Sequence, residues 1–329
     1  MWKYIIRRVL LMIPIIIGVV VVVFTINYLS GSSPAVALLG SYATPENVAQ
    51  LNAELGLDRP YLVQIGEYLW NVFSRFDFGT SYIYNVPVWS LIAQRFPVTA
   101  AIGLIGVALS VLVGIPLGVL AATKQYSFFD YASTLLAVLI AALPNFWVAL
   151  MMILLFSVRL HWLPVTGLAS WKSWILPCLS VGIGPIAMIT RMTRSSMLEV
   201  IRQDYIRTAR AKGLPERRVV MHHVLKNGLI PVATVIGMMI GISMTGTIIV
   251  ETIFNISGMG LLMYQSIMSN DTITVQGCVI VCAFIVTAMN LLTDIAYAFI
   301  DPRIRAQYVG AARRERRRKA AGPTGGAAL

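Results

Sequence analysis

The sequence predicts an all-α polytopic membrane protein, and its composition and its long apolar runs carry that prediction. Of 329 residues, 57% are hydrophobic and only 12% are charged, about half the charge that soluble domains carry. Six charge-free stretches approach the ~20 residues that a helix needs to cross a bilayer. Because lipid offers backbone groups no hydrogen-bond partner, each stretch is expected to be helical. The stretches are 9–29, 96–123, 131–158, 173–190, 227–250 and 272–293.

The distribution of charge predicts how this bundle is oriented. The chain carries 26 Lys and Arg against 14 Asp and Glu, a net charge of +12. In a membrane protein such an excess marks cytoplasmic loops, and no nucleic-acid partner is expected. With both termini cytoplasmic, 21 of the 26 basic residues fall on inner segments. The first apolar run is too long for a cleaved leader, so residues 1–29 are expected to remain as a first transmembrane helix.

Outside the predicted spans, the chain divides into segments of different character. Residues 30–95 are expected to lie on the extracytoplasmic side and to form short helices, with Thr44 capping a helix that starts at Pro45. Residues 96–308 are expected to form a five-helix core. Residues 309–329 are basic and low in complexity, which predicts a disordered cytoplasmic tail that touches anionic membrane lipid.

Within that core, the inner loop at 191–228 has the pattern of a helix, a corner and a second helix. An amphipathic helix is expected to begin near Ser195. Gly213 suits the left-handed conformation of a helix end, and Pro215 can open the next helix. Connections in helix bundles usually have about 2–8 residues, so the length favours a docking element for a cytoplasmic partner over a solvated connector. The residues on the apolar face are Leu198, Ile201, Tyr205 and Ala209.

The stretch DYIRTARAKGLPERRVVMHHVLKNGLIP resembles the coupling loop of permease subunits in ABC importers of the dipeptide, oligopeptide and nickel branch. The branch pattern Asp-Tyr-x-Arg-Thr-Ala-x-Ala-Lys-Gly is met from Asp204 to Gly213, whereas the importer-wide Glu-Ala-Ala pattern is met only in part. The stretches LNAELGLDRPYLVQIGEYL, ALPNFWVAL and VETIFNISGMGLLMYQSI resemble further segments of the same branch. The resemblance covers nearly the whole chain, the basic tail excepted.

This resemblance implies the type I ABC importer permease fold, with six transmembrane helices, in a prokaryotic cell membrane. It also implies a second homologous permease subunit, two cytoplasmic ATPase subunits and an extracytoplasmic substrate-binding protein or lipoprotein. Dipeptides or oligopeptides are the expected cargo. Nickel chelates or another small solute stay as an alternative, and so does a self-contained secondary transporter. The residues expected to couple to an ATPase are Asp204, Tyr205, Arg207, Thr208, Ala209, Lys212, Gly213, Leu214 and Pro215.

No catalytic or nucleotide-binding chemistry is expected in this chain. A phosphate loop of the form GxxxxGK[ST] does not occur in the sequence, so ATP and Mg²⁺ are expected in the partner subunits and no cofactor is expected here. The adjacent His222 and His223 face different sides of a helix, which predicts no metal site. The three cysteines lie in apolar stretches and predict no disulfide framework.

Polar and adaptable residues within the spans are the candidates for the transport pathway. A charge in lipid is costly and indicates function, so Asp294 is expected either to pair with a basic residue or to gate. Glu251 and Asp271 flank the last outer loop and are expected to shape an outer mouth. Methionine adapts to varied apolar surfaces, so the methionines of the fifth stretch form either core or a substrate-tolerant gate. The pathway or gate candidates are Met238, Met239, Met244, Asn145 and Asp294.

Overall fold

The computed structural model describes residues 2–29, 34–245 and 247–300. Over these residues the chain is mostly helical, and an isolated antiparallel bridge joins Thr80 to Pro87. Five helices are long and apolar enough to cross a membrane, and a bent pair of helices adds a sixth span if it is counted as one. The predicted all-α membrane fold is therefore confirmed. The tail predicted at 309–329 lies outside the described residues.

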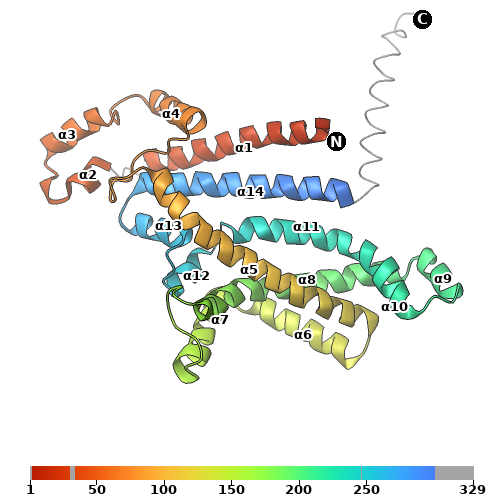
Figure 1. The fold of residues 1–329 in the computed structure, drawn as a ribbon. Helices are drawn as coiled ribbons and strands as arrows, with labels where there is room; N and C mark the ends of the chain where they lie inside the picture. Colours follow the sequence, from red (N-terminus) through yellow and green to blue (C-terminus); the bar gives the residue numbers. More distant parts are fainter. Residues whose placement is uncertain (1, 30–33, 246, 301–329) are drawn as a thin grey trace, which may run out of the picture.

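The long helices run beside one another and give the molecule two ends (Figure 1). α1 packs along α14, α5 packs along α8, and α11 contacts both α8 and α14. One end carries the short helix α9, and the opposite end carries α3 and α4. We call them the α9 end, which is predicted to be cytoplasmic, and the α4 end. The five long helices are α1 (Trp2–Leu29), α5 (Val88–Thr123), α8 (Ile175–Ile201), α11 (Leu225–Ser243) and α14 (Thr272–Ile300).

The third predicted span, 131–158, is helical but sharply bent at the proline that it contains, Pro144. Its two halves meet at 101°. The break falls at Leu143, which is extended (φ −84°, ψ 129°) because the ring of Pro144 disfavours the helical region for the residue before it. The elements are α6 (Phe128–Ala142), α7 (Asn145–Met152) and a π-helical segment (Ile153–Arg159).

The fifth predicted span also ends earlier than expected, at Ser243. Buried Glu251 explains the difference, because its carboxylate accepts hydrogen bonds from Thr99 Oγ1 at 2.7 Å and Thr247 Oγ1 at 2.6 Å. A backbone N–H of the following helix donates a third bond at 2.9 Å. A buried carboxylate needs such donors, and these three bonds hold the turn that follows α11. The turn is built from α12 (Ile248–Ile253) and α13 (Met259–Met268).

The segment between α1 and α5 forms a small helical cap at the α4 end. Thr44 caps α3 as predicted, since its Oγ1 accepts the Asn47 N–H at 3.3 Å. The cap is tied to α1, because the Tyr61 ring lies 6.0 Å from Phe24 and the Tyr61 hydroxyl lies 2.6 Å from Thr25 Oγ1. The elements are α2 (Pro34–Leu39), a 3₁₀ turn (Gly40–Tyr42), α3 (Pro45–Glu54), α4 (Tyr61–Trp70) and a π-helical segment (Asn71–Arg75).

The packing of α5 against α8 is the most extensive helix contact among the described residues. At Gly118, an added Cβ atom would lie 2.5 Å from Thr193 Cβ and 2.7 Å from the Thr190 carbonyl oxygen. Small residues at such crossings let two helix backbones approach closely. Glycine at this position therefore sets the spacing of the two helices near the α9 end.

We expect Gly118→Leu to destabilise the protein by about 1–3 kcal/mol or more, because the side chain overpacks a closed contact. Thermal unfolding in detergent measures the loss. Gly18→Leu is the matched control, since a Cβ at Gly18 of α1 meets nothing within 4 Å among the described residues. Equal unfolding temperatures for the two variants would show that the α5–α8 spacing is not fixed by Gly118.

Candidate functional site

The candidate site is the short helix α9 (Asp204–Ala211) and the corner that follows it. α8 runs past the predicted end at residue 190 to Ile201, and the chain then breaks at Arg202. The next residue, Gln203, is extended (φ −72°, ψ 147°), and α9 starts directly after it. The single helix predicted from Ser195 is therefore two helices, and α9 stands apart at the end of the bundle (Figure 1).

This break changes which side chains face the protein. Ile206 and Ala209 are buried, whereas Tyr205, which was predicted on the apolar face, is 45% exposed. Tyr205 Oη instead accepts a hydrogen bond from Asn227 Nδ2 at 2.9 Å. Periodicity counted across the break misplaced the face of α9. Its buried side joins the ends of α5 and α8 in what we call the anchor cluster, which comprises Ala122, Met197, Ile206, Ala209, Val219, Val220 and Val224.

The corner after α9 has a specific backbone conformation and an ion pair. Gly213 has φ +74°, which confirms the predicted left-handed helix end. Leu214 packs against the anchor cluster, and Pro215 (φ −62°) precedes the next helix. Across the corner, Arg210 Nε and Nη2 donate to the Glu216 carboxylate at 3.0 and 2.6 Å, and these bonds raise the pKa of Arg210. The packing of Leu214 is the buried contact of this corner, whereas the Arg210–Glu216 pair is exposed and adds little.

Beyond the corner, the chain returns to the bundle as one helical rod. α10 (Glu216–Arg218), a π-helical segment (Val219–Val224) and α11 are continuous from residue 216 to 243. In the sequence, α8 therefore precedes α9, and this helical rod follows it. α9 is therefore joined through the chain to two long helices.

Most of the predicted coupling residues form an exposed polar surface on α9 and its corner. Arg207 Nη1 lies 3.8 Å from Asp204 Oδ1, and Thr208 Oγ1 donates to the Asp204 carbonyl at 3.0 Å. Ala209 is buried and Leu214 is partly buried, so these two hold the element in place instead of offering contact surface. The exposed members are Asp204, Tyr205, Arg207, Thr208, Lys212, Gly213 and Pro215.

A buried ion pair fixes the same end of the bundle, and sequence reasoning missed it. Asp130, at the start of α6, accepts hydrogen bonds from Nε and Nη2 of Arg194 on α8, the second at 2.8 Å. The Tyr126 backbone N–H donates to the same carboxylate at 3.0 Å. The signal was present in the sequence, because one charge directly precedes the third predicted span and the other follows the fourth on the same side.

The five pathway candidates lie in different surroundings. Asp294 Oδ2 is 2.8 Å from Arg8 Nη1 of α1, so the first of its two predicted roles, pairing with a basic residue, is the one seen. Met244 is buried in a cluster with residues of α1, α5 and α14. Participation of these side chains in transport stays a prediction. Met238 and Asn145 are exposed, and Met239 and Asp294 are partly exposed.

Two family models match the chain. The model described as "Binding-protein-dependent transport system inner membrane component" matches residues 114–306, and the N-terminal model of the same membrane component matches residues 1–103. Together they span both the bundle and the helical cap. The chain therefore belongs to the family of inner membrane components of binding-protein-dependent transport systems.

Individual relatives match over nearly the whole chain. A Brucella abortus (strain 2308) chain named for a peptide transport system permease is 40% identical, over 93% of this chain and 99% of its own. The dipeptide transport system permease protein DppB of Escherichia coli (strain K12) is 38% identical, over 93% of this chain and 99% of its own length. The family assignment makes this chain a multi-pass permease component that works with ATPase and substrate-binding partners, and it excludes the self-contained secondary transporter.

A solved structure shows the same fold at lower identity. The inward-facing MetNI methionine ABC transporter has a chain with a TM-score of 0.53 and 17% identity, which covers 65% of this chain and 97% of its own. This similarity supports the importer permease fold alone. About a third of the present chain lies outside this match.

We expect Asp130→Ala to destabilise the protein by about 3 kcal/mol, because it strands the Arg194 charge in a site that is only 28% exposed. Asp204→Ala is the control, since the exposed pair with Arg207 should contribute nothing measurable. Unfolding temperatures in detergent give the comparison. The Asp130→Ala/Arg194→Ala double variant should lose less than the sum of the two single variants, and simple additivity would show that the pair does not join α6 to α8.

Proposed function

We propose that this chain is one of two permease subunits in an ATP-driven importer of peptides, and that α9 is the contact through which ATPase subunits drive it. The observation that carries the proposal is the construction of α9, with a buried side in the anchor cluster and an exposed polar side beyond the bundle. A docking partner can bind the exposed side of α9, and the buried side then transfers the motion of α9 to α5, α8 and α11.

The proposed mechanism requires α9 to move as a rigid unit. Nucleotide-driven closure of a pair of ATPase subunits would displace α9 as a unit, because its buried side is packed in the anchor cluster together with residues of α5 and α8. Packed helix bundles respond to such a push by shifting between discrete packings and not by continuous deformation. In this proposal the α9 end is cytoplasmic, as are both termini, and the pathway forms between this chain and a second homologous permease.

Peptides are the proposed cargo, because the relatives that match over nearly the full chain are named for peptide or dipeptide transport. The α4 end would face an extracytoplasmic binding protein that delivers them. ATP and Mg²⁺ would be bound by the partner ATPases, and this chain would bind neither. Nickel chelates or another small solute are the alternative cargo, which a direct assay of the assembled complex would reveal.

We expect Gly213→Pro to lower peptide transport by about tenfold, within the usual range of coupling free energies, while ATP hydrolysis by the assembled complex persists. Proline fixes φ near −65° and removes the N–H that Gly213 donates to the Arg210 carbonyl, so the corner must rearrange. Uptake and hydrolysis are measured together in proteoliposomes that contain all subunits.

Gly167→Pro is the matched control for that experiment. Gly167 also has a positive φ, of +77°, and also donates its N–H to a carbonyl, that of Phe254, but it lies outside α9 and its corner. An equal effect of both prolines would argue for general damage to the fold. Normal uptake in assembled Gly213→Pro complexes would reject α9 as the coupling element.

The isolated chain should hydrolyse no ATP above background, whereas the assembled complex should hydrolyse ATP and accumulate labelled dipeptide. Phosphate release and uptake are the two measurements. Robust hydrolysis by the pure chain would overturn the division of labour. Uptake of a nickel chelate coupled to ATP hydrolysis, with no uptake of any dipeptide, would show that the cargo is the chelate and not a peptide.

A further inference from the structure

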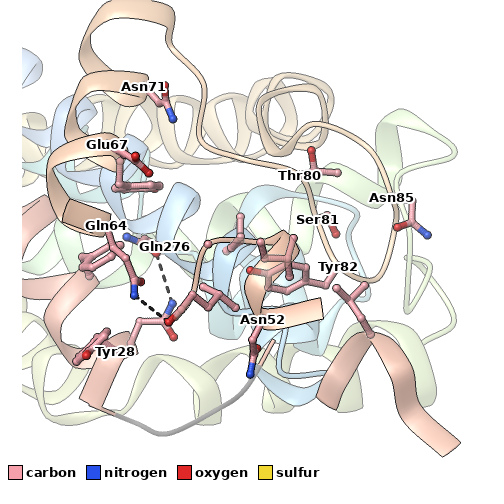
Figure 2. A pocket seen from close by; sticks show the side chains of 18 residues that line it. Tyr28, Asn52, Gln64, Glu67, Asn71, Thr80, Ser81, Tyr82, Asn85 and Gln276 are labelled. Carbon is pink, nitrogen blue, oxygen red and sulfur yellow. Dashed lines mark hydrogen bonds between the residues drawn. The ribbon is translucent and has the colours of Figure 1, made fainter. Parts of the chain in front are cut away.

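The helix α4 and the π-helical segment that continues it, which together we call the 61–75 helix, have three different faces. Each face recurs every three or four residues, as side chains on one side of a helix do. One face is buried or partly buried against the protein and consists of Tyr61, Ile65, Tyr68 and Val72. A second face is polar, and Figure 2 shows it along a cavity of about 660 Å³. It consists of Gln64, Glu67 and Asn71.

The third face is apolar and open, and no other described part of the chain covers it. Leu62 is 77% exposed and Trp70 is 67% exposed. The face is hollowed into a shallow groove of about 410 Å³, a size within the range of about 300–1,000 Å³ that small-molecule sites occupy. Contiguous exposed apolar surface of this kind marks a contact with a membrane or a partner. The groove is lined by Gly66, Leu69, Trp70, Phe73 and Ser74.

The depth of the 61–75 helix follows from its contacts with α1. The 22 residues from Arg8 to Leu29 suit a membrane crossing, and they span about 33 Å, close to the ~30 Å of a hydrocarbon core. Leu29 therefore lies near the surface of the bilayer. The rings of Tyr61 and Tyr68 lie 6.0 and 5.6 Å from that of Phe24, which is five residues, or about 7.5 Å, before Leu29. Figure 1 shows α4 beside this end of α1.

The surroundings at this depth indicate lipid as the apolar partner. Val22 and Ile26 of α1 are 56% and 64% exposed, as expected for a membrane helix that faces acyl chains. The more polar α3 instead lies beyond the end of the bundle (Figure 1). Interfacial amphipathic helices lie about 5–10 Å into the boundary between headgroups and acyl chains, and tryptophan is enriched there. The depth of the 61–75 helix and the exposure of Trp70 agree with both rules.

We propose that the 61–75 helix lies in the leaflet at the α4 end, and that the groove on its apolar face binds one acyl chain of a membrane phospholipid. Leu69, Trp70 and Phe73 supply apolar contacts along the acyl chain. Gly66 leaves room for it, because glycine has no side chain. The polar face of the same helix borders the cavity, so the helix separates lipid from a polar space inside the protein.

Spin labelling tests the depth. A nitroxide is attached at Trp70→Cys in the full chain, assembled with its partner subunits in phosphatidylcholine vesicles. Power saturation compares collisions with oxygen, which concentrates in lipid, and with water-soluble chromium oxalate. We expect oxygen to dominate at position 70, as at Ile13→Cys on the exposed surface of α1, and chromium oxalate to dominate at Gln50→Cys on α3. The complex without an added cysteine gives the background from native thiols.

Filling the groove tests the acyl-chain site. Gly66→Trp should remove one bound phospholipid per copy of this chain in native mass spectrometry of the assembled complex, because the new side chain occupies the groove. An added Cβ atom at Gly66 meets nothing within 4 Å, so the change does not overpack the protein. Gly18→Trp is the matched control, since Gly18 is equally open and exposed on a membrane helix but does not line the groove.

Each measurement can overturn the proposal. Dominance of chromium oxalate at position 70 would place the apolar face in water. A label that neither reagent reaches would show that another protein chain covers the face. Equal numbers of bound phospholipids in Gly66→Trp, Gly18→Trp and the unaltered complex would reject the groove as an acyl-chain site. These readouts do not involve transport, so none of these results bears on the proposed function.

Discussion

The anchor cluster is the interaction on which the proposed mechanism depends. Ile206 and Ala209 bury one side of α9 against Met197 of α8, Ala122 of α5 and the valines that lead into α11. Burial of a side chain such as isoleucine, methionine or valine stabilises a fold by about 1.5–3 kcal/mol, and burial of an alanine by less. A helix of eight residues is too short to persist alone in water, so its shape and its attachment come from the same contacts.

The sequence was sufficient for the fold class and for the corner of the candidate site. Long charge-free runs predicted the membrane helices, because a bilayer imposes both length and helicity. The corner was predicted correctly because Gly213 and Pro215 restrict backbone conformation locally, whatever the rest of the chain does. Membership of the permease family agrees with the motif from Asp204 to Gly213.

Features that depend on distant residues could not be predicted. The break at Gln203 shifts the buried face to Ile206, and nothing in the local pattern marks that break. The early end of α11 is set by Glu251, whose donors come from α5 and from the segments around it. The 101° bend was signalled by Pro144, but a proline permits anything from a mild kink to a sharp turn. The size of such a bend cannot be calculated from the proline alone.

The length of α5 links the two regions of interest in this molecule. Its 36 residues span about 54 Å at 1.5 Å per residue, well beyond the ~30 Å of a hydrocarbon core. At one end Val88 donates its N–H to the Gly79 carbonyl, in the segment that precedes α5, and at the other end Ala122 belongs to the anchor cluster. Because one helix reaches both ends of the molecule, we expect a tilt at one end to displace the other. Pro97 and Pro116 lie within α5, and a bend of the helix at either proline would reduce that displacement.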